Sequence, residues 1–166
     1  MNTTHTTLRR VGGALLGTAA AASLAVLAAP TATAAPVDCR APGEAEVIKA
    51  DGTSECAAAS VPGGAAAAYG IEGWALAEAG SGSLALAIGR DGGRAASTAT
   101  GGAAPAAIAM GPESSVSLAG SGPELTLGLA GAGATVTSDG AGNYSCSGGP
   151  AFAGNLLTLR GCMSQG

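Results

Sequence analysis

The four cysteines are the residues whose spacing most directly predicts chemistry. Cys39 and Cys56 enclose 16 residues near the start of the mature chain, and Cys146 and Cys162 enclose 15 near its end. An even number of cysteines in a short exported chain is typical of a disulfide framework, and four cysteines allow three connectivities. We favour the two short-range pairs, 39 with 56 and 146 with 162.

Histidine is almost missing from the chain. The single one, His5, lies in an N-terminal segment that we expect to be removed. Without histidine the mature protein lacks Ser-His-Asp and Cys-His nucleophile systems, and it also lacks the commonest metal ligand. We therefore predict no catalytic, cofactor-binding or metal-binding residues, no cofactor and no enzymatic activity.

Carboxylates are the remaining candidates for catalysis. The ones worth weighing are Glu44 with Glu46, Asp51 with Glu55, Glu72 with Glu78, and Asp91. Two catalytic carboxylates must face one another across a cleft at a defined separation, and these spacings do not require that. Solvated surface charge is the preferred interpretation, and a carboxylate hydrolase is a third option that two carboxylates converging in one cleft would favour.

The Asp-Gly pairs at Asp91 and Asp139 are interpreted as turns and not as calcium sites, because the glycine-rich nonapeptide of calcium-binding β-rolls is missing.

The N-terminus has the three parts of a secretory signal. Arg9 and Arg10 precede an apolar run over 11–29, and Ala32-Thr33-Ala34 forms a small-residue cleavage site. We predict a signal-peptide helix over 1–34, cleaved between Ala34 and Ala35, and a secreted, extracellular or cell-envelope protein. An uncleaved membrane anchor is the alternative, because about 19 apolar residues can span a bilayer. After cleavage no stable membrane anchor is expected.

The mature part is acidic and poor in large apolar residues. Seven basic residues less Arg9 and Arg10 leave five against eleven acidic residues, so its net charge is −6. Lys49 is the only lysine, which argues against nucleic acid or an anionic membrane as partner, since both require clustered basic residues. Leu, Ile, Val and Phe account for only 20 of the 132 mature residues. Two disulfides would then supply stability that a thin core does not.

Short stretches of alternating side chains fill the middle of the chain, separated by glycine-containing turns. Large residues alternate with Ala, Ser or Thr, and the first residues of successive stretches lie about ten residues apart. One interval is twice as long, and a weak strand at 95–100 is expected in its middle. The stretches are 74–78, 84–88, 106–110, 115–119, 125–129 and 134–138. This predicts an all-β fold, a β-solenoid or β-roll with small residues inside. A β-meander or sandwich is the alternative, although a wide sandwich core requires more aromatic residues.

The mature residues 35–166 are expected to form one domain with three parts. Residues 35–68 contain a hairpin with its turn at Asp51-Gly52, closed by the first disulfide, and a connector over 60–68 with at most one helical turn. The strand repeat occupies 69–140. Residues 141–166 form a C-terminal cap with closing strands that include 156–159. Trp74 and Phe152 are expected to cover the two ends of the stack.

Several segments resemble a family of small exported actinobacterial proteins of unknown function. They are the paired cysteines, the Asp-Gly-Thr-Ser-Glu-Cys segment over 51–56, Ala-Met-Gly-Pro over 109–112, and the ending from Ala-Phe-Ala at 151–153 to Gly-Cys at 161–162. The resemblance covers the mature chain. It implies a compartment and a common fold, and it carries no assigned activity or site.

A second resemblance concerns the repeat alone. Ala-Leu-Ala-Ile-Gly over 85–89 and Ala-Ile-Ala-Met-Gly over 107–111 are similar to the Ala-Ile-Gly repeat in the heads of trimeric autotransporter adhesins, which are β-rolls. This likeness implies a roll, and not a trimer or an adhesin.

These observations predict an exported, non-catalytic protein that is a structural or surface-interaction component of the cell envelope or exterior, with an envelope or extracellular protein as partner. The alternative is a small secreted binding module for a ligand, glycan or host protein, using the connector over 60–69 or the region of Trp74. An exposed Trp74 beside Tyr69 and Glu72 would favour the binding module, whereas a buried Trp74 would favour the structural role.

Overall fold

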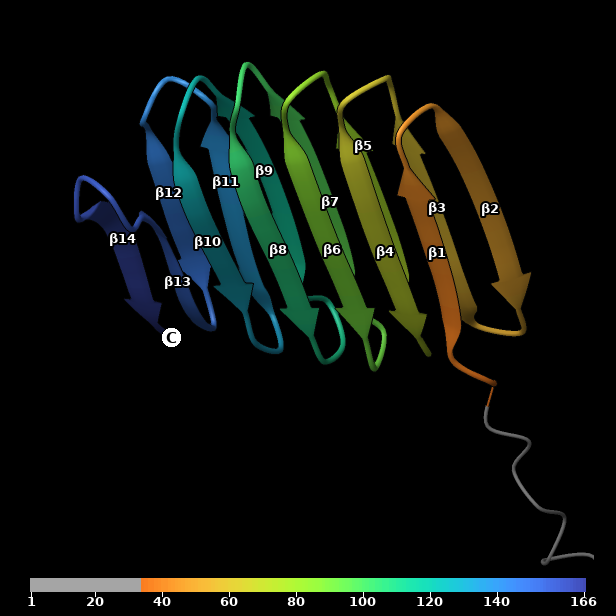
Figure 1. The fold of residues 1–166 in the computed structure, drawn as a ribbon. Helices are drawn as coiled ribbons and strands as arrows, with labels where there is room; N and C mark the ends of the chain where they lie inside the picture. The colour runs from red at the N-terminus through yellow and green to blue at the C-terminus, as the bar shows by residue number, and fades with distance from the viewer. Residues whose placement is uncertain (1–33) are drawn as a thin grey trace, which may run out of the picture. The chain divides into compact units, whose positions relative to one another are not determined.

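The computed structural model describes residues 34–166, which form one compact all-β unit (Figure 1). Fourteen strands make two seven-stranded sheets. The predicted β-solenoid is confirmed, and the sandwich alternative is not needed. The signal peptide expected at 1–34 lies outside the described residues, except for Ala34.

The strands alternate between two facing sheets, here called sheet A and sheet B. Sheet A contains, in spatial order, β1 (Val37–Pro42), β4 (Ala65–Ile71), β6 (Leu84–Arg90), β8 (Ala104–Met110), β10 (Leu125–Ala130), β13 (Pro150–Asn155) and β14 (Arg160–Gln165). Sheet B contains β12 (Tyr144–Gly148), β11 (Ala134–Asp139), β9 (Ser115–Ser121), β7 (Arg94–Thr100), β5 (Trp74–Ala79), β3 (Ser54–Ser60) and β2 (Ala45–Asp51).

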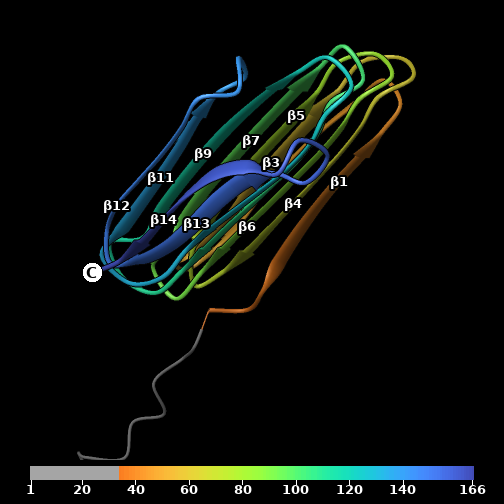
Figure 2. The same ribbon diagram turned by 90° about the vertical axis from the view of Figure 1, so that its left-hand side faces the viewer.

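Each coil of the solenoid is one strand of sheet B followed by one strand of sheet A. The pairs β3–β4, β5–β6, β7–β8 and β9–β10 form four such coils, and successive coils pair in parallel in both sheets. The ten-residue interval in the sequence is therefore one strand with its turn, and two intervals complete a coil. Figure 2 shows the two layers lying close together in a flattened coil.

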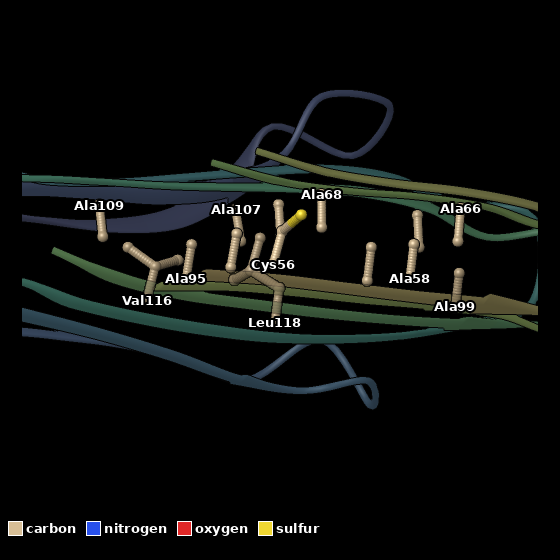
Figure 3. Packing of buried hydrophobic residues seen from close by; sticks show 14 of the residues in the cluster. Cys56, Ala58, Ala66, Ala68, Ala95, Ala99, Ala107, Ala109, Val116 and Leu118 are labelled. Atoms are coloured by element: carbon tan, nitrogen blue, oxygen red, sulfur yellow. The ribbon is translucent and has the colours of Figure 1, made fainter. Parts of the chain in front are cut away.

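The space between the sheets is filled almost entirely by alanine (Figure 3). Ala58, Ala77, Ala87, Ala95 and Ala107 are at most 1% exposed and point inward from both sheets. The disulfide between Cys39 and Cys56 joins β1 of sheet A to β3 of sheet B across this interior. The small inward residues expected from the sequence therefore set a very narrow interior.

The two largest buried side chains are matched by a glycine. Val116 and Leu118 point inward from β9 and are 1% and 2% exposed. On β10, the facing residue is Gly128, where an added Cβ would lie 3.0 Å from side-chain atoms of both. The interior keeps its width because bulk on one sheet is offset by a missing side chain on the other.

Antiparallel strands close both ends. At the N-terminal end β1 pairs with β4 and β2 pairs with β3; at the C-terminal end β12 pairs with β11, and β13 and β14 extend sheet A beyond β10. Trp74 and Phe152 lie within sheets and cover neither end, so that prediction was wrong. Aromatic caps are unnecessary because antiparallel strands occupy the hydrogen bonds of the outermost coils.

The disulfides join 39 to 56 and 146 to 162, the pairs favoured from their spacing. The first does not close the hairpin of β2 and β3 as expected. It links β1 of sheet A to β3 of sheet B, and the second links β12 of sheet B to β14 of sheet A. Each bridge therefore clamps the two layers together at one end, and loops of this size stabilise by about 3 kcal/mol in the chain-entropy model.

Two local predictions were wrong. The alanine run of the expected connector forms strand β4, because neighbouring strands on both sides satisfy its backbone and override the helical preference of alanine. The expected closing strand over 156–159 is a turn between β13 and β14, with Leu159 at φ +57°. Asn155 stabilises this turn, since its side-chain oxygen accepts hydrogen bonds from the backbone N–H groups of Leu157 and Thr158.

Replacement of Ala95 by leucine tests the narrow interior. Ala95 is fully buried on β7, and its neighbour Ala96 points outward on the same strand. We expect Ala95→Leu to lower the free energy of unfolding by about 1–3 kcal/mol or more through overpacking, as measured by urea unfolding. Ala96→Leu is the matched control and should change it by less than about 0.5 kcal/mol. Equal effects of the two variants would contradict an alanine-limited core.

Candidate functional surface

The outward surface of sheet A is a continuous apolar face. Because side chains alternate along each strand, the positions between the buried alanines point away from the core. One row runs across the sheet in hydrogen-bonded register and consists of Tyr69, Ile88, Ile108, Leu129, Phe152 and Met163. We call the outward residues of β4, β6, β8, β10 and β13 the apolar face. Large apolar residues, which normally fill a core, are here on the outside.

Charge is nearly excluded from the apolar face. Among the outward positions of β4, β6, β8 and β10, the charged residue is Arg90, at the end of β6. Its Nε donates to the carboxylate of Asp91 at 3.0 Å. Leu84 is 59% exposed, Met110 45% and Leu125 42%. Such a contiguous exposed patch marks an interaction surface, whereas scattered apolar residues would not.

The apolar face is not flat, because its strands differ in the size of their outward side chains. Leu84 and Leu86 stand outward on β6, while their lateral neighbours on β8 are Ala104 and Ala106. A hollow of about 280 Å³ is lined by these residues and by the outward alanines of β4. On the far side of β8, Leu125 and Leu127 of β10 pair with Ala104 and Ala106. Leucine ridges therefore alternate with alanine grooves from strand to strand.

The apolar character continues to the C-terminal end of sheet A. Phe152, Leu156, Leu159 and Met163 line a second hollow of about 320 Å³. Leu159 is 88% exposed and Met163 74%. The sequence pattern predicted a closing strand at 156–159 and therefore did not reveal this exposed turn. A short leucine-rich run has the same sequence pattern whether it forms a strand or an exposed loop.

The outward surface of sheet B is more polar, although Ile48 of β2 and Trp74 and Leu76 of β5 also point outward. Thr98, Ser117, Thr135 and Thr137 are exposed there on β7, β9 and β11. Thr126, on β10 of sheet A, points into the core and is 1% exposed. The two faces of the solenoid thus differ in chemistry, and only one of them is suited to an apolar contact.

A separate groove of about 810 Å³ lies at one edge of the coils and surrounds Trp74. The ring of Trp74 is partly buried, and the guanidinium carbon of Arg94 lies 5.3 Å from its centre, in a cation–π contact. Glu72 lines this groove, but Tyr69 points outward on the other sheet, where Arg40 lies 5.9 Å from its ring. The expected grouping of Trp74 with both Tyr69 and Glu72 is therefore only half formed.

Of the carboxylates weighed from the sequence, Glu55, Glu72 and Asp91 line the Trp74 groove together. Asp51 is not among the lining residues with its expected partner Glu55, and neither is Glu78 with Glu72. Within residues 34–166, acidic, cysteine and histidine side chains do not gather into a group of three that could hold a metal ion. The groove is thus an acidic surface groove with one aromatic side chain.

The other Asp-Gly turn is organised by its own side chains. The carboxylate of Asp139 accepts hydrogen bonds from the Asn143 side chain and from the backbone N–H groups of Ala141 and Asn143. These bonds, that of the Asn143 side chain first, hold the pKa of Asp139 below its usual value. Its oxygens are engaged within the turn, as expected for a structural Asp-Gly turn.

In the part of the chain that the structure describes, no helix is long and apolar enough to span a bilayer.

Trp74 is the only tryptophan of the chain, so its fluorescence reports on the groove. We expect Arg94→Ala to shift the emission of Trp74 to longer wavelength, because the guanidinium group no longer covers the ring, and to cost about 0.5–1 kcal/mol of stability. Arg90→Ala is the control, since Arg90 pairs with Asp91 at the same edge. An emission spectrum unchanged by Arg94→Ala would contradict the stacked arrangement.

Comparison with known proteins gives a family but no function. Neither a curated protein nor a solved structure matches the chain. A family model does match, over residues 3–165, and its description is a family of unknown function, DUF6764. The expected membership of a family without assigned activity is thereby confirmed, while its actinobacterial origin and the likeness to adhesin heads stay predictions. The chain belongs to the DUF6764 family of unknown function.

Proposed function

We propose that this protein is an exported, non-catalytic component of the cell envelope or exterior that acts by binding through its apolar face. The observation that carries the proposal is the uninterrupted row of apolar side chains across sheet A, backed by a core that is already complete without them. Exposing such a face to water is unfavourable by roughly 25 cal/mol per Å². A face of this kind is stable in solution when something covers it.

The two disulfides support an oxidising, extracellular environment, since such bonds persist in exported proteins and are rare in the cytosol. The sequence signal at 1–34 agrees with that compartment. Export places the apolar face where it meets envelope components, other exported proteins or host surfaces.

A second candidate function is favoured by the Trp74 groove. An aromatic ring flanked by Arg94 and by the carboxylates of Glu55, Glu72 and Asp91 is the type of surface that binds a polar ligand or glycan. This is the binding-module alternative. We rank it second because Trp74 is the only large apolar side chain among the residues that line the groove, and because Arg94 already covers its ring.

The proposal of export is tested by mass spectrometry of the protein purified from culture medium and from the envelope, digested without reduction. We expect a mature N-terminus at Ala35 and the peptide pairs that contain 39 with 56 and 146 with 162. An intact N-terminus or free thiols would contradict export by cleavage into an oxidising compartment.

The role of the apolar face is tested by Ile108→Arg, which places a charge at the middle of sheet A. Wild-type protein from the medium or from an envelope extract should elute in an assembly larger than a monomer, and Ile108→Arg should elute as a monomer. The physical reason is that an unpaired buried charge costs about 2–5 kcal/mol at an interface. Size-exclusion chromatography with light scattering measures this directly.

Ser117→Arg is the matched control, because Ser117 is exposed at the middle of the opposite sheet. It should elute like the wild type. Identical monomeric elution of all three proteins would overturn the proposal that the apolar face is the contact surface.

A further inference from the structure

We propose that the apolar face binds a second copy of the same chain, face to face, in a two-fold symmetric dimer. This inference rests on the proposed function and names its partner. The ridges and grooves of the face favour a second copy of the chain as the partner over other apolar surfaces.

The ridges and grooves of the face are self-complementary. The ridges are the leucine pairs on β6 and β10, and the grooves are the alanine pairs on β8 and β4. Ridge and groove are always one strand apart, which is about 4.8 Å. Another copy of this chain carries the same alternation at the same spacing, so its ridges can lie in these grooves.

A two-fold axis parallel to the strands and midway between β6 and β8 achieves this fit. That operation places β6 over β8 of the second copy, and β4 over β10. Leu86 then lies over the second copy's Ala106, and Leu127 over its Ala67. The ridge-and-groove fit belongs to the leucine and alanine rows. Along the neighbouring row large apolar residues meet, since Ile88 lies over the second copy's Ile108 and Tyr69 over its Leu129. Arg90 faces Met110 and not another arginine.

The same axis lies half a strand from the middle of the seven-stranded sheet A. Three strands, β1, β4 and β6, lie on one side of it and four, β8, β10, β13 and β14, on the other, so six strands are covered and β14 extends beyond the second copy. Six strands about 4.8 Å apart and about 23 Å long cover roughly 650 Å², so pairing removes about 1,300 Å² from water in total. This reaches the size of a standard specific interface, about 1,200–2,000 Å².

Charge favours a second copy over an anionic lipid surface. The acidic side chains lie on sheet B or at the edges of the coils, as in Glu55, Glu78 and Glu113, and Asp38 at the end of sheet A is paired with Arg40 at 3.1 Å. An anionic surface would be repelled by this acidic surround, because the mature part has five basic residues against eleven acidic ones. The contact brings Asp38, already neutralised by Arg40, over Phe152 at the edge of the interface, while the acidic groups of sheet B stay in water.

The test uses purified mature protein, residues 35–166, in sedimentation velocity between 1 and 100 µM (about the range of weak to firm dimers). The wild type should sediment as a dimer at the upper concentration. Ala106→Leu fills the groove with an apolar side chain, and we expect it to weaken dimerisation about 10- to 100-fold through overpacking at the interface.

A paired substitution separates shape from hydrophobicity. Leu86→Ala combined with Ala106→Leu exchanges ridge and groove, so each new leucine meets a new alanine of the second copy, and dimerisation should return to within about threefold of wild type. Ala96→Leu on the opposite sheet should leave it unchanged. Urea unfolding of each variant verifies that the monomer fold is kept.

A wild type that stays monomeric at 100 µM, a trimer, or an Ala106→Leu variant that dimerises as well as wild type would each overturn the dimer. If Ile108→Arg still abolishes the larger assembly in cell extracts while the purified chain is monomeric, the proposed function stands and its partner is another molecule. If neither Ile108→Arg nor Ala106→Leu has an effect, both proposals fail.

Discussion

The width of the interior is the constraint on which the rest of the structure depends. Alanine occupies most inward positions of both sheets, so little side-chain volume separates them, and a disulfide joins the two sheets at each end. At that separation a leucine fits inward only where the opposite residue gives up its side chain, as Gly128 does for Leu118. Each coil must match the width of the next, because parallel pairing holds successive coils in register.

This constraint decides where large apolar residues go. A chain with few of them would ordinarily bury them all, yet Leu84, Leu125 and Met110 are more than 40% exposed. The interior has no room for them, so they occupy the outward positions. Most of them do so on sheet A, while sheet B carries mainly small, hydroxyl and charged residues besides Ile48, Trp74 and Leu76. Geometry alone would allow large residues on either sheet. Their concentration on one sheet is therefore a property of the sequence that the fold does not require, and this is why we assign a function to that face.

Much of the architecture could be predicted from the sequence because it depends on local, periodic information. Period-two alternation, turn glycines and the ten-residue interval determine strands and coils, and small residues in each stretch indicated a narrow core. With small residues expected inside, the large ones had to point outward, but the alternation did not indicate that most of them share one sheet, because that depends on which strands pair between coils. The alanine run of β4 and the turn at 156–159 were misjudged for a related reason: both depend on neighbours distant in sequence, β1 and β6 for the first and the end of sheet A for the second.

A thin core also explains why the bridges lie where they do. In the middle of the solenoid every strand has hydrogen-bonded neighbours on both sides, and the chain itself passes from one sheet to the other at each corner. The end strands have a neighbour on one side only, so local opening is easiest there. Cys39 to Cys56 and Cys146 to Cys162 join the layers at these two ends, which limits fraying where alanine packing contributes least. Because the layers are held together from end to end, sheet A remains one continuous surface from β1 to β13, and a continuous surface is what a contact across these six strands requires.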